Sequence, residues 1–212
     1  MGSKVVEIRW HARGGQGAVT AAKTLAEMAL TKDMYFQAFP EYGPERSGAP
    51  IQCFNRLSQE RISTYCGITN PQIVVVVDPT LLDVVDVTHG LIEGGTVIVN
   101  TPEDPNTIRE KINRQDGKIY TLDATHISLE ELKRFMPNIP MLGALLKVTG
   151  LLTEEDAVGY LQEAFGKKFP QKVVDSNISA LKRAFEEVKE EWAEKTTTTS
   201  NSGAGKNTPL VQ

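Results

Sequence analysis

A glycine-rich turn near the start of the chain constrains the fold more than any other feature. The β-prone run Val5 to Trp10 leads into three glycines within Gly14 to Gly17, after which Ala18 to Ala22 favour a helix. The first N–H groups of a helix lack acceptors within it, and the helix dipole adds about half a positive charge there. Glycines let an anion approach the backbone closely. The sequence therefore predicts a strand, a tight turn and an anion-binding helix N-terminus, with the Arg13 charge beside it.

Two well-known nucleotide motifs fit this turn only in part. Gly15-Gln16-Gly17 supplies the first two glycines of the G-x-G-x-x-G dinucleotide fingerprint, but Thr20 stands at the third position. The acidic residue that would bind a ribose is missing, because the expected second strand, Met34 to Pro40, runs into a polar loop. No Lys-Ser/Thr pair follows Gly17, which excludes a Walker phosphate loop. Taken alone, the turn is equally compatible with a helix that merely packs on a sheet.

Strand and helix patterns alternate over the first 125 residues. Strands are expected at 5–10, 34–40, 51–56, 61–65, 73–77, 96–100 and 118–122, with 51–56 and 61–65 forming an edge hairpin. Helices are expected after Gly17, over 80–87, over 105–112 and repeatedly from Ser128 onward. This order predicts an α/β fold: a three-layer α/β/α sandwich with a mostly parallel sheet, a helical C-terminal part and an extended C-terminal tail.

Domain organisation follows from the apolar content. Residues 1–195 are expected to form one domain around one core, and residues 196–212 lack the apolar content to fold unaided. Thr153 with Asp156 predicts a capping box, and Ser176 is expected to cap the final helix.

Ligands of such sheets gather at the carboxyl ends of the strands. Gln16, Asp78 and Asn100 are therefore expected to share one rim. Asp78 and Asn100 are interpreted first as turn formers and helix caps, because these residue types commonly play those roles.

Composition excludes several classes of function. The net charge of −4 and the scattered Lys and Arg residues argue against nucleic-acid binding. No apolar run approaches 18 residues, so a cytoplasmic protein without a membrane segment is expected. Two cysteines and three dispersed histidines cannot build an iron–sulfur cluster or a zinc site within one chain. No metal site and no catalytic residue is predicted, which indicates an accessory subunit.

Two loops together resemble a known family. His11 to Ala22 is similar to the R-G-G-Q-G opening of the γ subunits of 2-oxoacid:ferredoxin oxidoreductases, the pyruvate synthase group. Glu41 to Pro50 is similar to the second loop of that family, and Met141 to Leu145 to a segment near its C-terminal helices. The resemblance covers about residues 4 to 190. Ser47 stands where the family often has a bulkier or basic residue, so the 2-oxoacid stays open.

The resemblance implies the chemistry of a multi-subunit enzyme. Such a complex oxidatively decarboxylates a 2-oxoacid with coenzyme A to give acyl-CoA, CO2 and reduced ferredoxin. Thiamine diphosphate, Mg²⁺ and 4Fe-4S clusters would lie in companion α, β and ferredoxin-like δ subunits, and none of these groups would be held by this chain alone. The resemblance makes the γ chain a cap over the active site that handles coenzyme A as co-substrate.

The expected site residues fall in the two loops. Coenzyme A phosphates would bind the first loop, at Arg13, Gly14, Gly15, Gln16 and Gly17. The second loop would form the active-site mouth or a subunit interface, with the residues Glu41, Tyr42, Gly43, Pro44, Glu45, Arg46, Ser47 and Gly48. Two alternatives stay open. In the first, neighbouring chains hold both loops structurally and coenzyme A binds elsewhere. In the second, the chain is a stand-alone nucleotide-binding or regulatory module.

Overall fold

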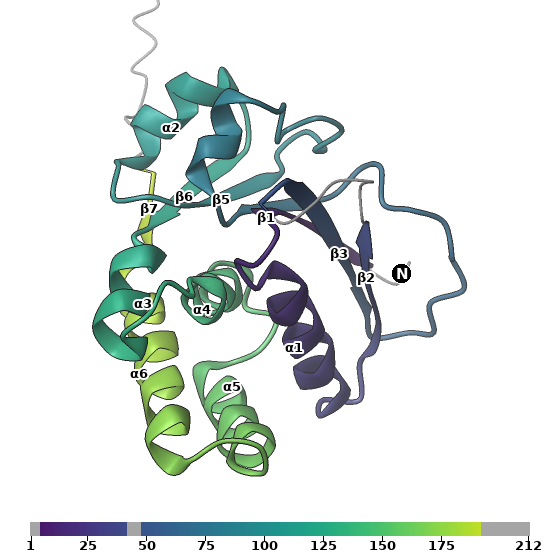
Figure 1. Ribbon diagram of the computed structural model, residues 1–212. Coiled ribbons are helices and arrows are strands. Elements are labelled where there is room, and N and C mark those ends of the chain that lie inside the picture. The colour runs from purple at the N-terminus through teal and green to yellow at the C-terminus, as the bar shows by residue number, and fades with distance from the viewer. Residues whose placement is uncertain (1–4, 42–47, 192–212) are drawn as a thin grey trace, which may run out of the picture.

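A seven-stranded sheet forms the middle of the protein (Figure 1). The structure is a computed structural model that describes residues 5–41 and 48–191. The strand order is β2-β3-β1-β4-β5-β6-β7. The strands are β1 (Val6–Arg13), β2 (Tyr35–Glu41), β3 (Pro50–Ser58), β4 (Ile73–Val76), β5 (Thr96–Asn100), β6 (Lys118–Leu122) and β7 (Lys189–Glu190).

The sheet is parallel at its centre and antiparallel at its flanks. β1, β4, β5 and β6 pair in parallel, whereas β3 runs antiparallel to both β1 and β2, and β7 runs antiparallel to β6. β2 therefore points the same way as β1, and only β3 and β7 run in the opposite direction. The predicted, mostly parallel α/β sheet is confirmed. Its central strand β4 is apolar and buried along its whole length, as a strand covered on both faces must be.

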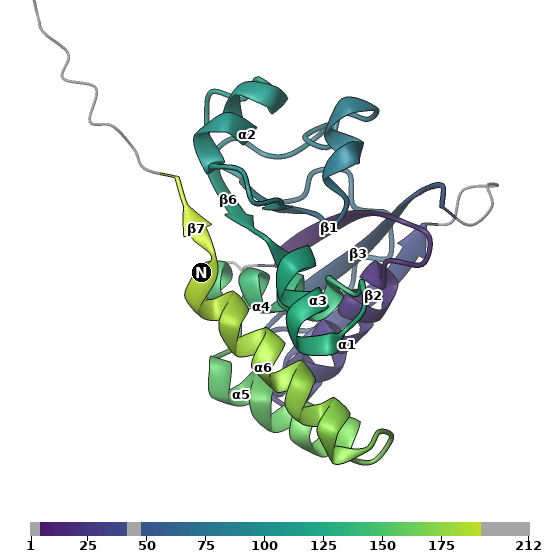
Figure 2. The same cartoon turned by 60° about the vertical axis from the view of Figure 1, so that its left-hand side comes forward.

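Helices cover both faces of the sheet (Figures 1 and 2). On one face lie α1, α3, α4, α5 and α6, which form a large core with β1, β3 and alternate residues of β4 to β6. On the other face, α2 and the short 3-10 helix η1 form a smaller core with Val74, Val76, Val97 and Val99. The helices are α1 (Ala18–Leu30), η1 (Pro79–Asp83), α2 (Pro105–Ile112), α3 (Ala124–Leu132), α4 (Asn138–Thr149), α5 (Glu154–Tyr160), the π-helix η2 (Leu161–Phe165) and α6 (Gln171–Glu187).

The strand expected at 61–65 does not form. Its presumed partner β3 already has β2 on one side and β1 on the other, so β3 has no free edge for a third strand. The edge hairpin is β2–β3 instead. Residues 61–65 form a loop in which the Thr64 carbonyl accepts hydrogen bonds from Gln37 and Arg56.

Three helix boundaries differ from the expectation. The helix expected over 80–87 is limited to η1, and the chain beyond it is irregular. The helical C-terminal part begins at Ala124, where the Asp123 carboxylate accepts from the His126 N–H, and not at Ser128. Ser176 lies inside α6, which begins at Gln171 after Pro170, so Ser176 caps nothing.

Other expectations are confirmed or fall outside the described part of the chain. The capping box of Thr153 and Asp156 is present at the start of α5. None of the helices in residues 5–41 and 48–191 is long and apolar enough to cross a membrane. Tyr42 to Ser47 and the tail 196–212 lie outside the described residues.

Candidate functional site

The turn between β1 and α1 lies at the sheet edge where the parallel strands end. β1 ends at Arg13 and β4 at Val76, and the hydrogen bond from the Gln16 side chain to Asp78, 2.6 Å, joins the turn to the segment after β4. β5 ends beside them, where the Asn100 amide donates to the Val77 carbonyl at 2.9 Å. The predicted common rim is confirmed.

The glycine-rich turn is tightly ordered by its own hydrogen bonds. The Arg13 N–H donates to Gln16 Oε1 at 2.7 Å, and the Gln16 N–H donates to the Arg13 carbonyl at 3.2 Å. Gly15 and Gly17 have φ angles of 97° and 81°, a left-handed conformation that side chains with a Cβ rarely adopt. These positions therefore require glycine for the turn to close.

The turn leaves backbone donors free for a ligand. α1 begins after Gly17, and no side chain caps its first N–H groups. Among the described residues, none accepts a hydrogen bond from the N–H of Gly15, Gly17 or Ala18. Free N–H groups at a helix N-terminus form a site for phosphate or carboxylate oxygens.

Asp78 binds three polar side chains of the rim, those of Gln16, Arg13 and Thr80. Its Oδ2 accepts from Gln16 Nε2 and lies 3.3 Å from Arg13 Nε, while its Oδ1 accepts from the Thr80 N–H and hydroxyl. Burial alone would raise the pKa of the Asp78 carboxyl, but the hydrogen bonds from Thr80 and Gln16 and the Arg13 charge lower the pKa below its usual value. The carboxylate thus stays ionised and offsets part of the Arg13 charge.

Arg13 spans three segments and keeps part of its surface open. Its guanidinium donates to the Thr80 hydroxyl at 3.1 Å and to the Gly48 carbonyl at 3.3 Å, in addition to its ion pair with Asp78. Its side chain remains 31% exposed. A guanidinium has five N–H donors, and the described residues accept from fewer than five, so within this part of the chain at least one is left for an incoming anion.

The two predicted loops touch each other. The Gly14 N–H donates to the Ala49 carbonyl at 3.1 Å, and Arg13 reaches Gly48. Glu41 ends β2, which runs in the same direction as β1, so the second loop leaves the sheet at the same rim. The predicted residues Tyr42 to Ser47 are outside the described part of the chain.

Asp78 and Asn100 serve as caps and turn formers, as their first interpretation predicts. Asp78 caps η1. The Asn100 amide donates to Val77 and to the Thr125 hydroxyl, and its oxygen accepts from the Thr125 N–H at 3.1 Å. Their side chains hold the segments of the rim together through these hydrogen bonds.

Two contributors to the rim escape sequence reasoning. Thr80 binds both Asp78 and Arg13, and the Asp-Pro-Thr sequence of a side-chain turn is the signal that could have indicated it. Asn138, at the start of α4, lies against Gly17: a Cβ built on Gly17 would come within 3.0 Å of the Asn138 amide. No local sequence pattern signals that contact, because it depends on where α4 packs.

Two residues of β1, Arg9 and His11, are buried polar side chains. Arg9 donates to the carbonyls of Val87 and His89, which pins the irregular segment after η1 to the sheet. His11 is only 3% exposed, and its Nε2 has no hydrogen-bond partner among the described residues. Burial, assisted by the Arg9 charge and opposed by Asp86, lowers the pKa of His11 to about 4. His11 is therefore neutral at pH 7.

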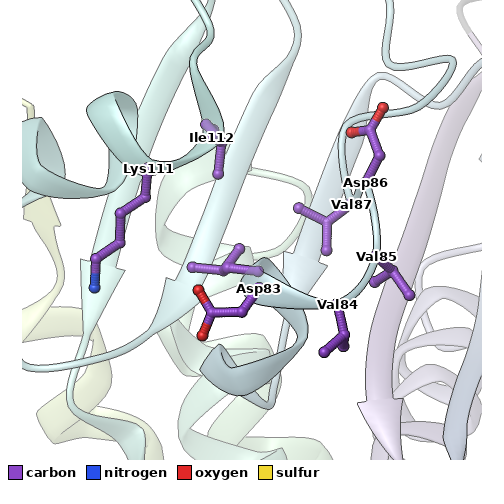
Figure 3. A pocket seen from close by; sticks show the side chains of 8 residues that line it. Asp83, Val84, Val85, Asp86, Val87, Lys111 and Ile112 are labelled. Atoms are coloured by element: carbon purple, nitrogen blue, oxygen red, sulfur yellow. The ribbon is translucent and has the colours of Figure 1, made fainter.

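A shallow cavity of about 370 Å³ lies between the segment Leu82–Val87 and the end of α2 (Figure 3). Lys111 of α2 and Asp83 of η1 both line it, together with the valines that follow η1. None of the predicted site residues lines this cavity, so it does not belong to the rim. In the described residues, no group of three His, Cys, Asp or Glu side chains is placed to hold a metal ion.

Comparison with known proteins identifies the family. Residues 7–187 match the family of pyruvate ferredoxin/flavodoxin oxidoreductases. The chain is 50% identical over 186 residues to a pyruvate synthase subunit PorC of Thermotoga maritima, with 88% of this chain and 96% of that subunit covered. It is 45% identical over 181 residues to the common γ subunit of the pyruvate/ketoisovalerate oxidoreductases of Thermococcus kodakarensis, covering 85% and 96%.

A solved structure agrees with the sequence comparison. The crystal structure of the pyruvate oxidoreductase subunit PORC from Thermotoga maritima superposes with a TM-score of 0.78 at 47% identity, over 88% of this chain and 98% of that chain. The fold expected from the resemblance is thus confirmed. The chain belongs to the pyruvate ferredoxin/flavodoxin oxidoreductase family.

Proposed function

We propose that this chain is the γ subunit of a multi-subunit 2-oxoacid:ferredoxin oxidoreductase, with pyruvate as the first candidate substrate. The complex would convert a 2-oxoacid and coenzyme A to acyl-CoA, CO2 and reduced ferredoxin in the cytoplasm. The observation that carries this proposal is the 50% identity to a pyruvate synthase subunit over 96% of that subunit's length. The related γ subunit of Thermococcus kodakarensis is common to the pyruvate and ketoisovalerate oxidoreductases. Branched-chain 2-oxoacids are therefore further candidate substrates.

Companion subunits would carry the redox groups. Among the described residues the only thiols are the buried Cys53 and the exposed Cys66, fewer than the four that a 4Fe-4S cluster needs. We therefore assign the clusters, the thiamine diphosphate and its Mg²⁺ to companion α, β and ferredoxin-like δ subunits. This chain would contribute binding and positioning.

The turn Arg13 to Gly17 would bind a phosphate of coenzyme A. The free N–H groups of Gly15, Gly17 and Ala18 would donate to its oxygens, and the open side of the Arg13 guanidinium would add a charge-assisted bond. Because Asp78 offsets part of the Arg13 charge, the backbone donors would provide the main attraction. The second loop, Glu41 to Gly48, would lie at the active-site mouth or the subunit interface beside this turn, since its end is hydrogen-bonded to it.

The test uses the complex purified with its native companion subunits. We expect 2-oxoacid-dependent reduction of ferredoxin that requires coenzyme A, assayed with pyruvate and branched-chain 2-oxoacids. Arg13→Ala should raise the KM for coenzyme A by about one to two decades, because a lost charge-assisted hydrogen bond is worth roughly 1.5–3 kcal/mol. The KM for the 2-oxoacid should hardly change.

A matched control separates the local from the general effect. Arg61→Ala removes a guanidinium from an exposed position that lines a groove with Val5 and Glu7, at the opposite end of β1 from the turn, so it should leave the KM for coenzyme A at the wild-type value. An assembled Arg13→Ala complex with unaltered coenzyme A dependence would move the phosphate site elsewhere. A chain that purifies without companion subunits and shows no coenzyme A-dependent activity with them would refute the subunit assignment itself.

A further inference from the structure

In residues 5–41 and 48–191, no strand pairs with the outer edge of the sheet at β2. β2 is the last strand in the sheet order, and it pairs only with β3 (Figure 1). Six of its seven residues, Tyr35 to Pro40, carry no charge. Proteins usually protect exposed edge strands with lysines, inward-pointing charges or bulges, because a free edge pairs readily with another chain. Among the described residues, Pro40 near the end of β2 is the one such protective feature of this edge.

Pro40 shows which backbone groups of β2 face outward. Proline has no N–H and is tolerated in edge strands where its nitrogen points away from the ladder. Pro40 lies opposite Cys53, so the alternation of the antiparallel ladder directs the N–H and C=O groups of Phe36 and Ala38 outward as well. No described residue hydrogen-bonds these groups. The edge therefore presents two donors and, with Pro40, three acceptors.

Two grooves flank this edge, one on each face of the strand. A groove of about 470 Å³ lies between β2 and α1, with Ala22, Ala26 and Phe36 among its walls. A second groove of about 530 Å³ lies on the other face, between Phe39 and the exposed Tyr65. Successive side chains of an added strand point to opposite faces, so they would enter the two grooves alternately.

We propose that the β2 edge binds an extended segment of a companion subunit, with apolar side chains at alternate positions. This inference rests on the proposed function, which supplies the companion subunits. A second copy of this chain is the less fitting occupant, because one seven-residue strand pairing buries far less than the roughly 1,200 Å² of a stable independent interface. A segment of a larger subunit needs no such area, since other contacts hold it in the assembly. Main-chain hydrogen bonds give the affinity and the grooves select the side chains.

The experiment removes one outward donor without touching the ladder to β3. Ala38→Pro deletes the outward N–H of Ala38, whereas the matched variant Ala38→Ser keeps it at the same exposed position. Each full-length chain is co-expressed with the companion subunits, and affinity for them is measured. Amide hydrogen exchange of Phe36 and Ala38 is followed in the wild-type chain alone and in the complex. Thermal unfolding of each variant chain checks that its own fold is kept.

The inference predicts at least tenfold slower exchange of the Phe36 and Ala38 amides in the complex, and at least tenfold weaker assembly of Ala38→Pro with Ala38→Ser unchanged. A complex that forms while both amides exchange as in the free chain would overturn the inference but leave the proposed function standing. Absence of any complex with the wild-type chain would overturn both. A dimer of the chain alone that Ala38→Pro dissociates would reassign the edge to a second copy.

Discussion

Gly17 offers a sharp test of how the rim is built, because the chain contains its own control. Gly15 and Gly17 both have a positive φ, 97° and 81°, but their surroundings differ. A Cβ on Gly15 would meet nothing within 4 Å, whereas a Cβ on Gly17 would lie 3.0 Å from the Asn138 Cγ and Nδ2 atoms and 3.1 Å from its Cβ. Gly15→Ala should therefore destabilise the chain through backbone strain alone, whereas Gly17→Ala should add a steric clash to that strain.

The magnitudes follow from these two terms. Left-handed backbone costs a residue with a Cβ about 1–2 kcal/mol, which we expect for Gly15→Ala. Crowding a packed contact adds about 1–3 kcal/mol. Asn138 is only 2% exposed, so we expect Gly17→Ala to lower the free energy of unfolding by both terms together, about 2–5 kcal/mol.

Urea unfolding of the full-length chain measures both variants, and a double-mutant cycle isolates the contact. Asn138→Ala removes the Cγ and Nδ2 atoms at 3.0 Å but keeps the Asn138 Cβ at 3.1 Å, so only part of the clash is relieved, and Gly17→Ala should cost about 1–2 kcal/mol less in that background. Equal losses for Gly15→Ala and Gly17→Ala, or no coupling between positions 17 and 138, would refute the account of how α4 supports the turn.

Local patterns were sufficient for the elements that lie within one stretch of sequence. The turn from β1 into α1 is encoded by the glycines and the helix-forming residues that follow, and β4 by a run of valines that only a doubly covered strand can bury. The rim follows from these strands, because parallel strands bring their carboxyl ends together. The family could also be predicted from the sequence, because each of the two loops is a continuous motif.

Features that depend on distant segments were not predictable in this way. Residues 61–65 have a strand-like alternation, but pairing was decided by β1 and β2, which occupy both sides of β3. The apolar spacing over 80–87 resembles a helix, yet Arg9 on β1 hydrogen-bonds the Val87 carbonyl and holds that segment against the sheet. The partnership of Gly17 with Asn138 likewise requires the packing of α4 on α1. Each of these three features depends on a contact between remote parts of the chain.

Three further substitutions test His11, Arg109 and Glu191, whose roles the sequence alone did not show. His11 has its pKa lowered from 6.5 to about 4 by burial, so protons bind the unfolded state preferentially as the pH falls between those values. The wild-type chain should lose about 2–3 kcal/mol of unfolding free energy between pH 7.5 and 4.5 relative to His11→Gln, and parallel pH profiles in urea titrations would contradict this. Arg109 donates to the carbonyls of Arg114, Asp116 and Gly117 and forms a bidentate ion pair with Glu191 just after β7. Arg109→Met leaves three carbonyls and a carboxylate without their donor, so it should cost about 3 kcal/mol, whereas Glu191→Gln keeps the carbonyl bonds and should cost about 1 kcal/mol. If the two variants unfold at the same urea concentration, the carbonyl bonds contribute nothing, and loss of the ion pair with Glu191 accounts for the whole effect.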